Sequence, residues 1–313
     1  MDPAASIGVV RHPLSPMSRV IGTTGLPDRL RDVGQTASMT TSSTPSDTSP
    51  ENPPVLLRIA DGVATITLNR PEAMNGLDLA TKDLLLATVQ QVGADPDVRC
   101  VVLTGSGRAF CVGQDLKEHL AGLQGDTSIP LSDTVTKHYN PTVLALATMP
   151  KPVIAALNGV AAGAGASLAF AADFRILIDT ATYNTSFAGV ALSCDTGASW
   201  TLPRLVGGAK AMELLYFPRT VDAAEALELG LATQVVAAAD FEQAVGELAL
   251  RLASGPTVSF GSIRQAVANS ASNTLEDSLA FEAEKMALTG DTLDHLAAVN
   301  AFVAKEKPVF TGR

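Results

Sequence analysis

Two short turns rich in glycine carry the backbone groups that could do chemistry in this chain of 313 residues. The first covers residues 105–116, GSGRAFCVGQDL, and the second covers residues 158–168, NGVAAGAGASL. Each follows an apolar run typical of a buried strand and precedes a helical pattern. The first N–H groups of a helix have no partner within it, and the helix dipole adds partial positive charge there. Two such helix ends that face one point could stabilise negative charge on a carbonyl oxygen.

Each of the two turns also has a purely structural interpretation. Residues 105–116 could form an ordinary glycine-rich loop in which Asp115 caps the following helix. The small residues around Gly163 could serve only to pack a helix closely against a sheet. A dinucleotide site is a further alternative, but no glycine triplet with the G-x-G-x-x-G spacing follows the first predicted strand.

The composition limits the classes of function. Hydrophobic residues make up 46% of the chain and charged residues 17%, which is typical of a globular protein with a substantial core. The formal net charge of −10 argues against a nucleic-acid partner, because such binding requires clustered lysine and arginine. Cys100, Cys111 and Cys194 have no metal-ligand spacing, and the histidines are scattered. We therefore expect a reduced, cytoplasmic protein without a metal site.

The pattern along the chain predicts three regions. Residues 1–54 are expected to form a disordered tail, because residues 39–54 are rich in Ser, Thr and Pro and have almost no apolar side chains. Residues 55–240 predict an α/β core and residues 241–313 a helical region. The apolar stretch over 153–172 is interrupted by glycines and bounded by charged residues, so no membrane span is expected.

Strands and helices are expected to alternate in the core. Residues 55–71 predict two strands joined by a turn at Asp61 and Gly62. Strands are then expected over 99–104, 153–157 and 174–178, and helices over 78–92, from 115, and over 164–172. This alternation predicts βαβ units and a mainly parallel sheet. After Trp200 the chain is expected to be almost entirely helical, over 207–216, 222–229, 240–254, 257–270, 274–289 and 291–306.

Several stretches between residues 55 and 312 together carry a resemblance to a known family. They are LNRPEAMNGL (68–77), GSGRAFCVGQDL (105–116), KPVIAALNGVAAGAGASLAFAAD (151–173), LPRLVGGAKAMELL (202–215), AAEALELGLATQVV (223–236) and AFVAKEKPVFTG (301–312). In this order they resemble the crotonase superfamily, also called the enoyl-CoA hydratase/isomerase family. The resemblance implies a crotonase-like spiral of ββα units, with a helical C-terminal region that completes the acyl pocket and builds trimers or dimers of trimers. It also implies an acyl-CoA thioester substrate from fatty acid metabolism, with CoA as part of the substrate and no separate cofactor.

The resemblance assigns an oxyanion hole to the two turns. In that family the residue after an Ala-Gly-like pair donates one N–H group, and here Gln114 follows Val112 and Gly113. The middle residue of a glycine triplet donates the other, and here that residue is Ala164, directly after Gly163. Alanine keeps the N–H group, but its Cβ narrows the backbone conformations that this position allows.

The resemblance also indicates which acid–base groups are present. Hydratases of the family carry two glutamates, and the matching positions are Ser167 and Val190, neither of which can act as a general base. Asp195 matches an aspartate that moves a proton in isomerases of the superfamily and acts as a nucleophile in a dehalogenase branch. Burial beside an apolar acyl chain would raise its pKa and make it a better base. The alternative role for Asp195 is to cap the helix near Trp200.

Further residues match family positions near the CoA or acyl group. Arg70 and Lys305 resemble positions near the CoA phosphates, although a lone basic residue is often solvated surface. Phe302 matches a helix that covers the acyl pocket, with core packing as the alternative. Cys194 could be a nucleophile, but no histidine precedes it closely, so packing is the preferred interpretation.

We therefore predict an enoyl-CoA isomerase-type enzyme in which Asp195 is the base. One alternative is an enoyl-CoA hydratase, in which Ser167 positions a water molecule together with Asp195. Another is a non-catalytic homologue that only binds acyl-CoA. The expected partner is an acyl-CoA thioester and further copies of the chain, with no nucleic acid and no membrane.

Overall fold

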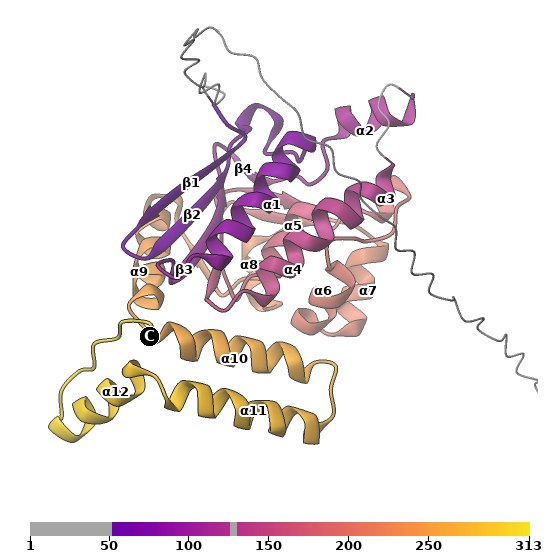
Figure 1. Ribbon diagram of the computed structural model, residues 1–313. Helices are drawn as coiled ribbons and strands as arrows, with labels where there is room; N and C mark the ends of the chain where they lie inside the picture. Colours follow the sequence, from indigo (N-terminus) through magenta and orange to yellow (C-terminus); the bar gives the residue numbers. More distant parts are fainter. Residues whose placement is uncertain (1–51, 126–129) are drawn as a thin grey trace, which may run out of the picture. The chain divides into compact units, whose positions relative to one another are not determined.

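A computed structural model of the protein describes residues 52–125 and 130–313 (Figure 1). The tail that the sequence predicts over residues 1–54 lies almost entirely outside this part of the chain. Within the described residues, no helix has both the length and the apolar character needed to span a bilayer.

The larger sheet has six strands in the order β1-β2-β3-β5-β7-β10 (Figure 1). β1 and β2 form the predicted antiparallel hairpin, with positive φ at Asp61 and Gly62, and the other neighbours pair in parallel. The strands are β1 (Val55–Ala60), β2 (Val63–Leu68), β3 (Cys100–Gly105), β5 (Val153–Leu157), β7 (Phe174–Ile178) and β10 (Gln234–Val236).

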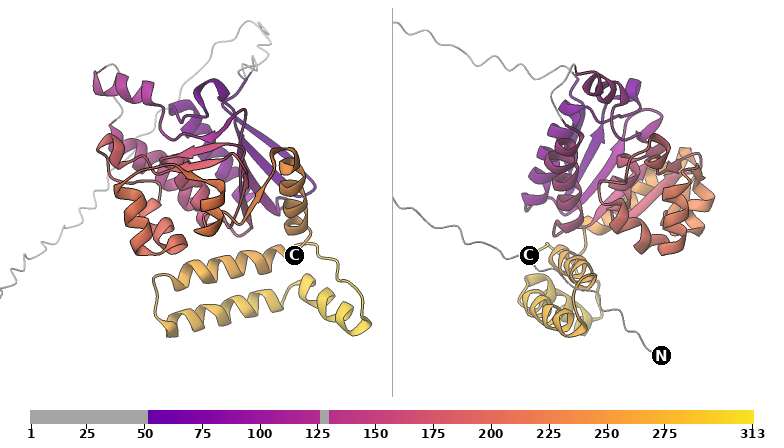
Figure 2. Two further views of the ribbon diagram at one scale, coloured as in Figure 1. Left: turned by 180° about the vertical axis from the view of Figure 1, so that it is seen from behind. Right: turned by 90° about the vertical axis from the view of Figure 1, so that its right-hand side faces the viewer.

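Buried side chains alternate between the two faces of this sheet, as expected for strands that are covered on both sides. Val101 and Leu103 of β3 pack toward α1 (Leu79–Ala94), whereas Cys100 and Val102 pack toward α9 (Phe241–Ala253). Figures 1 and 2 show these two helices on opposite sides of the sheet. The alternating βαβ architecture that the sequence predicts is therefore present.

A second, four-stranded sheet in the order β4-β6-β8-β9 was not predicted. Its strands have only two or three residues each, which is too short for a hydrophobic period to be recognised in sequence. They are β4 (Ala109–Cys111), β6 (Val160–Ala162), β8 (Thr182–Asn184) and β9 (Val221–Asp222). Because β9 and β10 lie beyond Trp200, the expectation of an almost entirely helical chain after that residue is wrong in this respect.

The remaining helices of the core include one segment that the sequence analysis left without an element. Residues 131–148 form α3 (Leu131–Thr134), a π-helical turn (Val135–Tyr139) and α4 (Asn140–Thr148), with Pro141 tolerated in the first turn of α4. The others are α2 (Leu116–Leu123), α5 (Ala164–Phe170), α6 (Ala198–Val206), α7 (Gly208–Tyr216) and α8 (Ala223–Glu228).

The C-terminal region is helical, as predicted. α10 (Thr257–Ser270) and α11 (Leu275–Gly290) lie side by side, and α12 (Leu293–Ala304) follows α11 (Figure 1). Arg264 ties α10 to the core, because its guanidinium pairs with Asp173 at 2.6 Å and also donates to two backbone carbonyls of the α4 segment. Fixed guanidinium geometry suits such a junction between several acceptors.

Asn75 holds together two loops that lead into the predicted site. It is fully buried and adopts a positive φ of 57°. Its side-chain oxygen accepts a hydrogen bond from Arg70 N at 2.9 Å, and its amide nitrogen donates to the carbonyls of Ser106 at 2.9 Å and Ala109 at 2.8 Å. Asparagine is suited to this position, because it tolerates the left-handed region and supplies both donors and an acceptor.

Replacing Asn75 by alanine is expected to destabilise the protein by about 3 kcal/mol, because buried backbone groups lose their partners. For a domain of this size that loss lowers Tm by roughly 6–12 °C. Thermal unfolding followed by circular dichroism would measure the change. Asn273→Ala, at an exposed asparagine, is the control. Equal Tm values for the two variants would contradict the structural role of Asn75.

Candidate active site

Pairing of β4 with β6 brings the two glycine-rich turns together. The pairing is parallel, with Ala109 opposite Val160 and Cys111 opposite Ala161. A Cβ atom added to Gly113 would lie 3.1 Å from the backbone nitrogen of Ala164. The backbones that carry the two predicted donors are therefore in direct contact, which is compatible with both donors serving one oxyanion hole.

Glycine is required at the contact between the two turns. At Gly113 φ is +82°, and an added Cβ would also lie 2.9 Å from the carbonyl oxygen of Ala162. At Gly165 an added Cβ would approach the carbonyl oxygen of Cys111 to 2.2 Å, so any side chain would separate α5 from β4. The small residues around Gly163 thus do provide close packing, and the same packing places the donor of Ala164 at the site.

The N–H group of Gln114 is directed by a backbone bridge to Leu77. Leu77 N donates to Gly113 O at 2.8 Å, and Asp115 N donates to Leu77 O at 3.2 Å, so the bridge uses the residues on either side of Gln114. In a parallel bridge, the residue between the two hydrogen-bonded neighbours, here Gln114, points its own N–H and C=O groups away from the partner strand. The N–H of Gln114 therefore points away from Leu77 and is available to another acceptor.

Ala164 fits the second donor position without strain. Gly163 adopts the unusual backbone conformation of this turn, with φ 49° and ψ −124°, and α5 begins at the next residue. Ala164 is not among the residues with positive φ, so its Cβ meets no conformational penalty. As the first residue of the helix, Ala164 has an N–H group with no partner inside α5.

Asp195 lies in a strained turn before α6. Its Oδ1 accepts a hydrogen bond from the hydroxyl of Thr196 at 2.8 Å. The cap residue of α6 is Gly197, without any side-chain hydrogen bond, so the alternative role of Asp195 as a helix cap is wrong. Thr196 is fully buried with φ 50°, a conformation that a β-branched residue rarely adopts and that costs of order 1–3 kcal/mol.

The electrostatic surroundings keep Asp195 a better base than an exposed aspartate. Burial raises the pKa of its carboxyl group above the ordinary value of 3.8, and the hydrogen bond from Thr196 lowers it, with burial as the larger effect. A higher pKa increases the affinity of the carboxylate for a proton, which is the property that a general base needs.

Tyr139 is a site residue that the sequence analysis missed. Its phenol is buried, with 3% of the residue exposed, and donates a hydrogen bond of 2.5 Å to the side-chain oxygen of Gln114. Burial, and then the nearby negative charges of Asp195 and Glu118, raise the pKa of Tyr139 well above its ordinary value, so it stays protonated. Tyr139 ends the π-helical turn, a rare element often found at functional sites, which no sequence pattern indicated.

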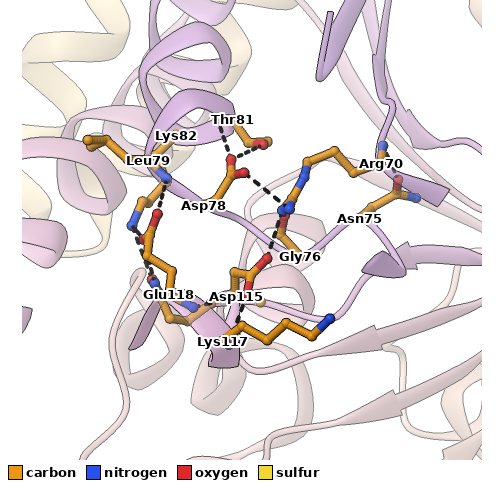
Figure 3. Close-up of polar contacts among 12 residues, drawn as sticks. Arg70, Asn75, Gly76, Asp78, Leu79, Thr81, Lys82, Asp115, Lys117 and Glu118 are labelled. Carbon is orange, nitrogen blue, oxygen red and sulfur yellow. Dashed lines mark hydrogen bonds and ion pairs between the residues drawn. The ribbon is translucent and has the colours of Figure 1, made fainter. Parts of the chain in front are cut away.

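The side chain of Gln114 is held from a second direction by a partly buried ion pair. Lys82 Nζ pairs with Glu118 Oε1 at 2.8 Å, and the same oxygen accepts from the amide of Gln114 at 3.1 Å. Glu118 Oε2 accepts from the backbone nitrogen of Leu79 at 2.7 Å, so this carboxylate also binds the first turn of α1. Figure 3 shows Lys82, Glu118 and Leu79 in this arrangement.

The two positions that match hydratase glutamates differ in their surroundings. Ser167 is fully buried, and its hydroxyl donates to the carbonyl of Gly163 at 3.1 Å, one turn back along α5. Val190 lies in a short 3₁₀ turn (Ala188–Val190) and is 56% exposed. Asp195 is thus the only acidic residue among the positions that the resemblance assigned to proton transfer.

The three residues predicted to contact CoA or its acyl group differ in their surroundings within one chain. Phe302 on α12 is 84% exposed, so core packing of this residue is wrong. Lys305 ends α12 in the left-handed conformation, and α12 packs against α11. Arg70 lies next to the site, but its guanidinium is bound by Asp78 and Asp115 (Figure 3).

Cys111 does not provide an alternative nucleophile. Cys111 is fully buried beside the predicted oxyanion hole, and burial raises the pKa of its thiol to about 12, which keeps it protonated. Cys194 is partly exposed and is a free thiol. In the part of the chain that the structure describes, no group of three or more His, Cys, Asp or Glu residues could hold a metal ion.

Known proteins resemble the chain over almost all of its described length. The sequence matches the enoyl-CoA hydratase/isomerase family over residues 58–313. It is 40% identical over 259 residues to the 1,2-epoxyphenylacetyl-CoA isomerase of Escherichia coli strain K12, covering 83% of this chain and 98% of that protein. It is 41% identical over 255 residues to a probable enoyl-CoA hydratase of Rhodobacter capsulatus, covering 82% and 96% respectively. A solved enoyl-CoA hydratase from Bacillus anthracis matches with a TM-score of 0.77 and 32% identity, covering 83% of this chain and all (100%) of that one.

Thr196→Val is expected to raise the pKa of Asp195 further, because it removes the hydrogen bond that favours the charged carboxylate. Carbon-13 NMR of the carboxyl groups during a pH titration would measure the shift, with Asp195→Asn used to assign the signal. Thr201→Val is the control, because the hydroxyl of Thr201 donates to a backbone carbonyl. An unchanged Asp195 pKa in Thr196→Val would show that the hydroxyl does not stabilise the carboxylate.

Proposed function

Because the chain belongs to the enoyl-CoA hydratase/isomerase family, we propose that it isomerises an acyl-CoA thioester with Asp195 as the single proton-carrying group. The observation that carries the proposal is the contact between the turns of Gln114 and Ala164, which supports a pair of backbone N–H donors. The charge of the Asp195 carboxylate acts on Tyr139, which binds the side chain of Gln114, and this supports Asp195 as the base. Two fixed donors and one base are sufficient for moving a proton within a thioester.

The proposed reaction begins when the thioester carbonyl oxygen accepts hydrogen bonds from the N–H groups of Gln114 and Ala164. Asp195 removes a proton from carbon, the C–H bond breaks, and its electron pair moves toward the carbonyl oxygen to give an enolate. The protonated Asp195 then returns the proton to a different carbon, and the enolate electrons form the new bond. No other reactant is consumed. One donor of such a hole stabilises the transition state by about 3–4 kcal/mol.

The side chains favour isomerisation over hydration. Addition of water by the two-glutamate route requires two acidic groups, and Ser167 and Val190 supply neither. The hydroxyl of Ser167 is already bound to Gly163. The relative named as a 1,2-epoxyphenylacetyl-CoA isomerase supports the same choice. Its name makes an aryl-substituted acyl-CoA one candidate substrate for this chain.

We also propose that copies of the chain assemble as a homotrimer or a dimer of trimers through the C-terminal helices. Support comes from the large apolar side chains that α10–α12 leave exposed, which include Ile263, Val267, Leu275, Leu279, Met286, Leu293, Leu296, Phe302 and Val303. Association would bury this surface. It would also give Phe302 and Lys305 their proposed roles at the acyl pocket and the CoA phosphates.

Three free cysteines support the proposal of a reduced, cytoplasmic protein.

Asp195→Asn is expected to lower turnover by about 10²–10⁴-fold, because it removes the general base. The assay would supply 2-enoyl-CoA, 3-enoyl-CoA and 1,2-epoxyphenylacetyl-CoA and analyse the products by mass spectrometry and ultraviolet absorbance. Isomerisation leaves the mass unchanged, whereas hydration adds the mass of one water molecule.

Asp179→Asn, at an exposed aspartate, is the matched control and should retain full activity. A hydrated product whose formation persists in Asp195→Asn would overturn the isomerase proposal. Tight binding of these thioesters by the wild type without any product would instead favour a protein that only binds acyl-CoA.

A further inference from the structure

We propose that Arg70 is a positioning residue of the oxyanion hole, which sets the direction of the Gln114 N–H group, and that it does not bind the CoA phosphates. The inference rests on the proposed function, because a thioester in the hole is what makes this direction matter. It replaces the role that resemblance alone gave to Arg70.

The guanidinium of Arg70 is bound from three sides by its own chain. Nη1 donates to the carbonyl oxygen of Gly76 at 2.6 Å and to Asp115 Oδ2 at 2.9 Å. Nη2 lies 3.1 Å from Asp78 Oδ2. Figure 3 shows these contacts converging on the guanidinium from the loop before α1 and from the start of α2. The rigid, planar fork of arginine suits several acceptors at fixed positions.

Each of the two carboxylates divides its oxygens between a helix and Arg70. Asp78 Oδ1 caps α1 by accepting from Thr81 N at 2.9 Å, which leaves Oδ2 for the guanidinium. Asp115 Oδ1 caps α2 by accepting from Lys117 N at 3.0 Å and Glu118 N at 3.3 Å, and its Oδ2 binds Arg70. One guanidinium therefore links the N-termini of two helices.

The contacts of Arg70 lie on both sides of the backbone bridge between Leu77 and Gln114, which sets the direction of the Gln114 N–H group. Gly76 directly precedes Leu77 on one side of the bridge, and Asp115 directly follows Gln114 on the other. Arg70 holds both flanking residues, so it fixes the separation and tilt of the two backbones. Without it, the bridge depends on two backbone hydrogen bonds of 2.8 and 3.2 Å.

The charges around Arg70 make a phosphate contact unfavourable. Two carboxylates within 3.1 Å already neutralise the guanidinium, and only 20% of its side chain is exposed. Burial acts to raise the pKa of Asp115, but the hydrogen bonds from Arg70, Glu118 N and Lys117 N outweigh it and lower that pKa. The carboxylate therefore stays ionised. An approaching phosphate would meet this fixed negative charge and would have to displace a buried partner.

The test compares Arg70→Gln with the wild type on two substrates that differ only in their distal part. One is an acyl-CoA, and the other is the corresponding acyl-pantetheine thioester, which has no phosphates. A positioning role predicts that kcat falls by about 10–100-fold on both substrates while KM changes little, since small misplacements of catalytic groups have effects of this size. Arg58→Gln, at an exposed arginine on β1, is the charge-matched control.

A second measurement does not depend on turnover. Hydrogen–deuterium exchange of peptides covering residues 111–118 is expected to be faster in Arg70→Gln than in the wild type and in Arg58→Gln. Should Arg70→Gln fail to fold, Asp78→Asn takes its place, because asparagine still caps α1 while its contact to Arg70 loses the ionic component.

The outcomes separate the two roles. A rise in KM for acyl-CoA alone, with unchanged kcat and unchanged acyl-pantetheine turnover, would overturn the inference in favour of phosphate binding. Unchanged exchange of residues 111–118 would also overturn it. If the wild type turns over no thioester, the proposed reaction is wrong, and the exchange measurement alone then decides the role of Arg70.

Discussion

The short parallel pairing between β4 and β6 is the constraint on which the site depends. It places a turn from the strand β3 against a turn from the strand β5, so closely that glycine is required at Gly113 and Gly165. The larger sheet, with β3 and β5 as direct neighbours, brings the two turns to the same edge. The donors of the proposed oxyanion hole are backbone groups, so their positions are set by strand pairing and by helix starts.

Because the donors of the proposed oxyanion hole are backbone groups, the side chains around them decide which reaction the proposed site supports. Asp195 is partly buried, and Tyr139 stays protonated nearby while it binds the side chain of Gln114. A low local dielectric strengthens each of these contacts and makes the loss of any one partner costly. The strained backbone at Thr196 fits this interpretation, because conformations of this cost are retained where the surroundings over-determine them.

Fold and function share the same polar groups in this part of the molecule. Asp78 and Asp115 start two helices, and the same carboxylates hold Arg70 against the loop that carries Gln114. Asn75 lies in the loop before α1, where it accepts a hydrogen bond from Arg70 N, and it connects this loop to the turn after β3 through two hydrogen bonds to Ser106 O and Ala109 O. Changes to these residues therefore alter stability and the geometry of the donors together, so a variant needs a measurement of each.

The sequence by itself determined the alternation of strands and helices, the two glycine-rich turns, and the replacement of both hydratase acids by Ser167 and Val190. These features are local, because periodicity, turn residues and residue types within a motif can be recognised without knowing distant contacts. Tertiary structure alone decided that the turns meet, since β4 and β6 are too short to show a period and exist only through pairing. It also decided the partners of Tyr139 and Arg70, because contacts between residues 25 and 45 positions apart depend on the folded backbone.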